Sequence, residues 1–529
     1  MARLKKPKPK PQKTNTLKVN LSSWYTVLIG TIVVWILSCS QKYYDIFLQR
    51  RHIFAILIIM TYLIAVYYIV FYKGKQDTET ILGLILFGGL LLRSYYVLAA
   101  RYDITIHDIG SFKGLTTEDT GVGHFGYIDY IYKNHALPDF DPRERWSFYN
   151  PPGFYILAAI VLGISQIFHV PEPMCYETIQ VITLCFSNLT VWTGCRILKE
   201  FFIKDKWLLL LTALLSFHPF FAVMAVTLTT DCMAMYFMIL AVWYTIRWQN
   251  EPGLRKIIVI ALAIGIGMFT KLNTGLLAFA IGAVFIYVFF KNRKEWKTYF
   301  VQFFVFAVIC VPIGLFNPIR NKINYDIPFT FVQQVDRGDW KFMADATPFS
   351  LFGFPPLGQI SYGFITFDPA QDKNAWIQVL KTACFDELRP DLGNSLFGAC
   401  ALVLLWLGIL LVVLMNSAFV WSICKKHIMK TELKLLCAIS YVTLLVSYMS
   451  FCMKEPFTFT MEYRYISISL LFPVIGAALW LQNGSDNNLF ETSKFRKILR
   501  NVLVCGTVCF IVLAVICQLD LIAWSNTRL

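Results

Sequence analysis

The sequence has 529 residues, of which 57% are hydrophobic and 15% are charged. Soluble proteins average about 25% charged residues, so this composition excludes a soluble enzyme, a disordered chain and a disulfide-stabilised scaffold. Apolar runs of about 20 residues, the length at which a helix crosses a bilayer, recur from one end to the other. The sequence therefore predicts an all-α polytopic membrane protein with roughly 12–14 transmembrane or re-entrant helices.

The chain opens with a basic segment, residues 1–20, which contains seven Lys and Arg residues and no acid. We expect a disordered arm on the cytoplasmic side, because Lys and Arg are enriched in cytoplasmic segments. The same bias explains the net charge of +15, which favours membrane lipid over nucleic acid as a partner. The 14 cysteines form no CxxC pair, so we interpret them as small buried apolar residues.

Two polar stretches, 101–150 and 317–394, interrupt the apolar segments and hold about half of the acids. Counting crossings from a cytoplasmic N-terminus places both outside. One conflict arises at 153–169. If this segment crosses fully, the basic loop after the next helix faces outward; if it is re-entrant, that loop is cytoplasmic. The predicted apolar helices are 24–40, 52–72, 80–100, 153–169, 177–198, 207–226, 228–246, 256–272, 273–290, 298–316, 396–422, 435–453, 464–482 and 501–523.

These boundaries divide the chain into four parts. The basic arm precedes a transmembrane module at 21–316, which includes the loop 101–150. A second extracytoplasmic loop, or lid, occupies 317–394, and C-terminal transmembrane helices occupy 395–529. The second loop is rich in Gly, Pro and aromatic residues, which predicts irregular turns and short helices.

The first loop carries the strongest chemical signal. His107 and Asp108 directly follow a predicted membrane exit, and Gly123 to Tyr132 has the pattern of an amphipathic helix on the membrane surface. A carboxylate at such a position can act as a general base or, beside a histidine, as a metal ligand. An acid there can also simply cap a helix or solvate the loop.

The ordered motifs of this loop, HDIG, GHFGYIDYI, LPDFDP and FYNPPGFY, resemble those of GT-C type membrane glycosyltransferases. Within that superfamily the similarity is to glycosyltransferase family 39, with bacterial relatives of protein O-mannosyltransferases and aminoarabinose transferases. Further matching motifs are TLTTDCMAMYF, GIGMFTKLNTG, FNPIRNKINYD and MEYRYISISLLFP. Such enzymes transfer a sugar from a polyprenyl-phosphate carrier to an acceptor outside the membrane.

The resemblance implies roles for individual residues. It makes Asp108 the catalytic base, with His107 beside it. We expect a single displacement that inverts the sugar's anomeric centre. A two-step retaining route would need a second carboxylate about 5–5.5 Å from the first, which Glu118 or Asp119 could provide. A desolvated cation paired with phosphate makes strong hydrogen bonds, so Lys271 and Arg464, with Tyr463, are expected to bind the donor phosphate. The alternatives are snorkelling of Lys271 to the interface and a salt bridge from Arg464 to Glu462 or Asp231. The expected substrate-binding residues are His124, Tyr127, Tyr149, Asp231 and Arg320.

The predicted cofactor is at most a divalent metal ion. Its candidate ligands are His107, Asp108 and His124, since histidines and carboxylates suit such a site. Alternatively, the histidines hydrogen-bond sugar hydroxyls or orient Asp108. Most loop aromatics, including Tyr127 and Tyr149, fit equally well in an interfacial aromatic belt.

The predicted partners are a polyprenyl-phosphate sugar, a glycan, lipid or protein acceptor, and membrane lipid. The expected location is the plasma membrane with the site facing outside, or the endoplasmic reticulum with a luminal site. Two other functions are compatible with many spans and intramembrane charges: a transporter or lipid flippase, and a non-catalytic assembly subunit. Transporters often contain two related halves, and no such repeat is visible in the sequence.

Overall fold

The computed structural model describes residues 21–100, 102, 121–329, 331–387 and 395–523. Within these ranges the chain is helical, and the sole strand-type pairing is an isolated antiparallel bridge between Phe342 and Phe457. Ten helical segments of the described chain are long and apolar enough to cross a membrane, which confirms the predicted fold class. They are Arg51–Tyr72, Thr78–Ala99, Met174–Glu200, Asp205–Val226, Leu272–Lys291, Arg293–Tyr325, Phe397–Cys424, Thr431–Lys454, Thr458–Asp486 and Lys494–Ile522.

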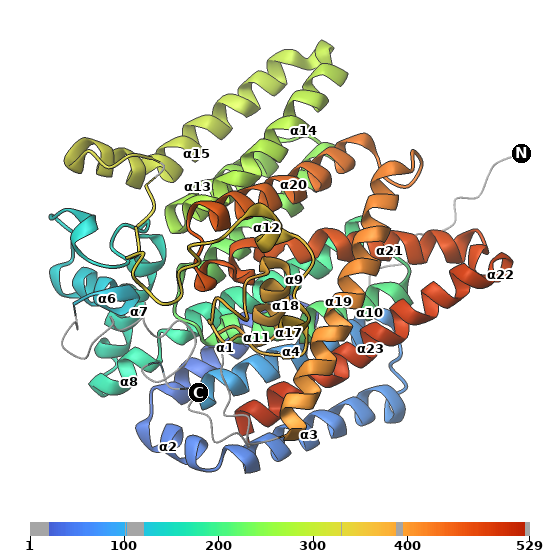
Figure 1. The fold of residues 1–529 in the computed structure, drawn as a ribbon, viewed down its shortest axis with the longest axis horizontal. Helices are drawn as coiled ribbons and strands as arrows, with labels where there is room; N and C mark the ends of the chain where they lie inside the picture. Colours follow the sequence, from blue (N-terminus) through green and yellow to red (C-terminus); the bar gives the residue numbers. More distant parts are fainter. Residues whose placement is uncertain (1–20, 101, 103–120, 330, 388–394, 524–529) are drawn as a thin grey trace, which may run out of the picture.

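Most of the long helices run in similar directions across the view, and the shorter ones lie both near its edges and near its centre (Figure 1). The long helices are α1 (Trp24–Ser38), α3 (Arg51–Tyr67), α4 (Thr78–Ala99), α9 (Gln180–Glu200), α10 (Asp205–Phe217), α12 (Thr230–Asn250), α13 (Leu254–Thr270), α14 (Leu277–Lys291), α15 (Trp296–Tyr325), α19 (Ser395–Cys424), α20 (Thr431–Lys454), α21 (Leu471–Asp486) and α23 (Lys494–Ala523). The shorter α-helices are α2 (Gln41–Gln49), α6 (Gly123–Asn134), α7 (Gly153–Ile167), α8 (Glu172–Glu177), α11 (Pro219–Val226), α16 (Pro348–Phe352), α17 (Leu357–Ile360), α18 (Ala375–Phe385) and α22 (Leu489–Thr492). A π-helical turn, η1 (Tyr68–Tyr72), follows α3, and the 3-10 turns are η2 (Pro142–Glu144), η3 (Leu272–Leu276), η4 (Arg293–Glu295), η5 (Thr458–Thr460) and η6 (Tyr463–Leu470).

Side-chain contacts show which connections share each end of the bundle. At one end, Lys199 pairs with Glu79, and Ser22 Oγ donates to the same carboxylate at 3.3 Å. A second ion pair joins the end of α14 to the start of α20, where Lys291 Nζ lies 2.6 Å from Glu432 Oε1. We call this the arm end, because the chain enters α1 there. The opposite end, which carries both long polar loops, is called the loop end.

Helix α7 stays at the loop end and does not cross the bundle. The Tyr102 N–H, just after α4, donates to Glu177 Oε2, just before α9, at 3.0 Å. The chain between them therefore starts and finishes at the same end. The start of α7 is there too, since a Cβ on Gly153 would lie 2.8 Å from Phe269 O near the end of α13. This geometry resolves the conflict at 153–169 in favour of a re-entrant segment, so the basic loop before α10 lies at the arm end.

The helices α2, α6, α7 and α8 form a layer over the loop end. A helix, α6, lies where one was predicted at Gly123 to Tyr132, and α2 joins the layer because the chain bends by 96° between α1 and α2. These helices share a hydrophobic cluster of their own, which includes Tyr44, Tyr127 and Tyr155 and is separate from the main core. The described part of the first polar loop, residues 121–150, thus belongs to a packed platform with a core of its own.

Helix α15 is longer than the predicted segment 298–316. The helix continues to Tyr325, passing through Pro312 and Pro318. Its last turns leave the apolar region but gain contacts with the first loop, since Arg143 Nη2 donates to Tyr325 O at 3.1 Å. Tertiary packing therefore extends a helix that its proline and polar residues alone would end.

The second loop is a compact cap that contains α16, α17 and α18, in agreement with the predicted short helices. Its centre is a fully buried ion pair, with Lys381 Nζ 3.0 Å from Asp372 Oδ1. The cap is attached to the membrane helices, since Thr458 Oγ1 donates to Phe367 O at 2.9 Å. The buried charges of Asp372 and Lys381 thus neutralise each other inside the cap.

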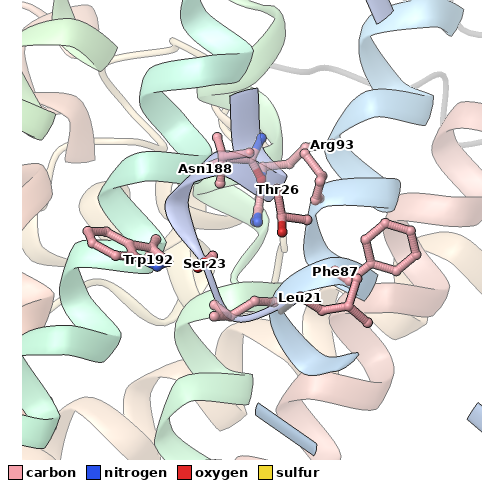
Figure 2. Close-up of a pocket in the computed structure, with 10 residues that line it drawn as sticks. Leu21, Ser23, Thr26, Phe87, Arg93, Asn188 and Trp192 are labelled. Carbon is pink, nitrogen blue, oxygen red and sulfur yellow. The ribbon is translucent and has the colours of Figure 1, made fainter. Parts of the chain in front are cut away.

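One membrane-spanning helix is broken, and a buried arginine stabilises the break. Pro219 starts α11 immediately after α10, and Phe220 N–H donates to His218 Nδ1. The Ser216 carbonyl, in the last turn of α10, accepts a hydrogen bond from Arg93 Nη1 at 2.6 Å. Arg93 Nε also donates to Asn188 Oδ1 at 2.8 Å. Figure 2 shows Arg93 and Asn188 beside a small pocket near Trp192. A cation at a helix C-terminus is favourable, which explains an arginine in the bundle interior.

Candidate functional site

Lys271 and Asp231 form one ion pair at the loop end. Lys271 directly follows α13, and Asp231 is in the first turn of α12, where the helix dipole favours a negative charge. The Lys271 ammonium pairs with Asp231 Oδ1, and the side chains are 21% and 8% exposed. The structure thus brings together two residues that the sequence singled out separately.

Arg464 and Glu462 form a second ion pair nearby. Arg464 Nε lies 2.5 Å from Glu462 Oε2, and Arg464 Nη2 lies 3.8 Å from Glu387 Oε1 of the second loop. Glu462 is fully buried, and Arg464 is 11% exposed. The salt bridge anticipated for Arg464 therefore exists, and the second loop contributes a further carboxylate to it.

Tyr465 joins the two ion pairs, although the sequence analysis did not select it. Its ring centroid lies 5.2 Å from Lys271 Nζ and 5.5 Å from the guanidinium carbon of Arg464. Tyr463, the other tyrosine of the same motif, was expected to bind the donor phosphate. In this structure its hydroxyl donates to Ser467 O, and its ring packs on Phe220. Both tyrosines flank Arg464 in the sequence EYRY, so the motif marks the site without showing which ring faces the cations.

Helix α7, which directly follows the first loop, places that loop beside the two ion pairs. Tyr155 Oη is 2.6 Å from His124 Nδ1 and accepts from Asn150 Nδ2 at 3.2 Å. Burial raises the pKa of the Tyr155 hydroxyl well above its usual range, and the negative charge of Asp231 adds to that shift. The Tyr155 hydroxyl therefore keeps its proton and shares a hydrogen bond with His124 Nδ1, and the imidazole tautomer decides which of the two donates.

The other predicted substrate residues have structural partners in the described chain. Tyr127 is stacked between the rings of Phe148 and Tyr155, at 4.6 and 4.3 Å. Tyr149 packs edge-on against Phe331, at the start of the second loop. These contacts hold the platform together and attach it to the second loop.

Arg320 also connects loop segments and does not join the two ion pairs. It donates to Pro138 O of the first loop, and its Nη1 donates to Asn321 Oδ1 at 3.3 Å. Its guanidinium also lies 5.6 Å from the ring of Tyr325. The contact to Pro138 fixes the end of α15 against the first loop.

The predicted catalytic residues His107 and Asp108 lie outside the described residues. Among the residues that are described, no three His, Cys, Asp or Glu side chains form a group suited to a metal ion. The third candidate ligand, His124, engages Tyr155 through Nδ1. The metal site, like the catalytic role of Asp108, remains a prediction from the sequence.

Comparison with known proteins gives a partial family match. Residues 150–315 match a family described as dolichyl-phosphate-mannose-protein mannosyltransferase, and this segment contains both Asp231 and Lys271. The chain is also similar to the crystal structure of ArnT from Cupriavidus metallidurans in the apo state, with 12% identity and a TM-score of 0.38 over 84% of this chain and 77% of that chain. No curated protein matches the chain in sequence.

The described helices define a polytopic, all-α protein with the composition of a membrane protein. The family match supports the resemblance of this chain to the GT-C membrane glycosyltransferases.

Proposed function

We propose that this chain is an integral-membrane glycosyltransferase that moves a sugar from a polyprenyl-phosphate donor to an acceptor outside the cytoplasm. The observation that carries the proposal is the pair of cations, Lys271 and Arg464, on one tyrosine ring at the loop end. A lipid phosphate stays at the membrane surface while its chain lies among apolar helices. Two partly buried cations at that level suit such a phosphate, because electrostatic stabilisation of developing charge is often the largest catalytic contribution.

The proposed reaction is a single displacement. The carboxylate of Asp108 accepts the proton of the acceptor hydroxyl, whose oxygen forms a bond to the anomeric carbon of the donor sugar. The bond from that carbon to the phosphate oxygen breaks, and the leaving phosphate takes the electron pair. Lys271 and Arg464 stabilise the additional negative charge. Attack opposite to the leaving phosphate inverts the anomeric centre.

The donor phosphate exchanges with carboxylates that are already in the site. Asp231 and Glu462 neutralise the two cations in this structure. The donor therefore replaces two existing ion pairs rather than binding to bare charges. Such an exchange reduces the net free energy gained on binding the substrate. The negative charge that grows on the leaving phosphate still strengthens its contacts with the cations in the transition state.

The proposed orientation follows from the basic connections. The described arm end carries Lys199, Lys204, Lys291 and Lys430, whereas the loop end carries the acid-rich loops. With the arm end in the cytoplasm, the loop end faces the outside of a plasma membrane or the lumen of the endoplasmic reticulum.

The test is a transfer assay on the full chain in lipid nanodiscs with a radiolabelled polyprenyl-phosphate sugar and a mixed glycan, lipid and protein acceptor extract. We expect acceptor-dependent release of polyprenyl phosphate, and its loss in Asp108→Asn. Lys271→Ala should cost about 2–4 kcal/mol of transition-state stabilisation, by analogy with the loss of an oxyanion donor. Lys291→Ala, which breaks an ion pair at the arm end, is the matched control and should keep full activity. Movement of the labelled lipid across the bilayer without sugar transfer would instead identify a flippase.

A further inference from the structure

Tyr465 is the single described side chain that contacts both cations of the proposed donor site. Its ring lies 5.2 Å from Lys271 Nζ and 5.5 Å from the Arg464 guanidinium. Both distances are within the range of about 6 Å at which a cation is attracted to an aromatic ring. The two cations come from segments nearly 200 positions apart in the sequence, so this ring is their common support.

The ring itself is held in place. Tyr465 belongs to η6, between α20 and α21, and its ring packs against Phe451 of α20 with 4.9 Å between centroids. Its backbone N–H donates to Glu462 O at 3.3 Å, in the same turn that carries Arg464. Phe451 and the turn of η6 therefore help to hold the ring beside the two cations.

Each cation also has a carboxylate partner that the donor must displace. A long Lys or Arg side chain is free to follow its carboxylate, because it has many rotatable bonds. A ring that attracts both cations keeps them near each other after the carboxylates are released. The two cationic side chains are then already spaced for one phosphate before the donor arrives. Less conformational entropy of these side chains is therefore lost on binding.

We propose that Tyr465 is a positioning residue that holds Lys271 and Arg464 close enough together for both to contact the same donor phosphate. The inference rests on the proposed function and adds a residue that determines recognition of the phosphate. The ring is the essential part, since both contacts are to the ring centroid. The hydroxyl of Tyr465 is not required.

The experiment compares Tyr465→Phe and Tyr465→Leu in the nanodisc transfer assay, with donor and acceptor titrated separately. Tyr465→Leu should lower kcat/KM for the donor about tenfold and leave the acceptor KM unchanged. It should also weaken inhibition by the product, polyprenyl phosphate, by a similar factor. Tyr465→Phe should restore both values to within about twofold of the wild type. The matched control is Tyr362→Leu, which removes a ring 5.9 Å from Lys381 in the second loop, away from the cation pair.

Each outcome separates the inference from the proposed function. Transfer by the wild type together with unchanged donor kinetics in Tyr465→Leu would overturn the role of the ring. Equal losses for donor and acceptor, or no rescue by Tyr465→Phe, would also overturn it, because they indicate general structural damage or a need for the hydroxyl. A wild type that releases no polyprenyl phosphate would overturn the proposed function instead. In that case, binding of polyprenyl phosphate by Tyr465→Leu and Tyr465→Phe, measured by microscale thermophoresis, still tests the positioning of the cations.

Discussion

The buried ion pair of the second loop allows a quantitative test of what holds this cap together. Asp372 accepts four hydrogen bonds: one from Lys381 Nζ at 3.0 Å, one each from the N–H and hydroxyl of Thr366, and one from Phe367 N–H at 3.0 Å. Both charged side chains are essentially fully buried. Burial lowers the pKa of the Lys381 ammonium, and Asp372 opposes that shift. The carboxylate thus compensates a charge that is costly to bury.

Replacing one partner should therefore have unequal effects. Asp372→Ala leaves a buried ammonium and two backbone N–H groups without their acceptor, and breaking a buried pair typically costs 3–5 kcal/mol. Lys381→Met removes one donor but leaves the carboxylate with three others, so we expect about 1–3 kcal/mol. The double variant Asp372→Asn with Lys381→Met removes both charges and should lie near the wild type.

The measurement is hydrogen exchange across α18, which reports the free energy of local opening of the cap. The control is Lys373→Ala in the same loop. It removes an ion pair with Asp345, whose side chain is 77% exposed, so hydrogen exchange across α18 should stay close to that of the wild type. If Lys381→Met opened α18 more than Asp372→Ala did, the assignment of Asp372 as the central acceptor would be refuted.

Three further predictions concern the rest of the fold. Arg93→Lys keeps the buried charge but cannot reproduce the forked hydrogen bonds that include Ser216 O, so thermal stability should fall by about 1–3 kcal/mol; an unchanged melting temperature in detergent would contradict this account of the helix break. Tyr155→Phe removes the hydroxyl that hydrogen-bonds to His124 Nδ1 and Asn150, so hydrogen exchange across α6 should increase; unchanged exchange would exclude this role of the hydroxyl. Arg320→Ala removes the contact to Pro138 O and should increase protease cleavage of the first loop, whereas equal cleavage would show that other contacts hold it.

Features that depend on local composition could be predicted before the fold was known. Residues such as 52–72 and 501–523 are so apolar that only a membrane-spanning helix can bury them, and the basic arm and polar loops follow from the same pattern. Lys271 and Arg464 were also identifiable, because an ionisable residue between apolar segments is a functional candidate by default. Their expected roles, and that of Asp108, came from motif resemblance.

How these parts meet depends on long-range packing. The segment 153–169 is apolar enough for a short helix, but its hydropathy does not reveal which end of the bundle each of its termini reaches. The contact between Tyr102 and Glu177 shows that the chain before and after this segment lies at the same end. In the same way, Arg464 and Tyr465 are adjacent in the sequence, but their relation to Lys271 depends on how α13 and η6 pack. Long-range pairing carries no local signal, so the partners of each charge appear only in the folded chain.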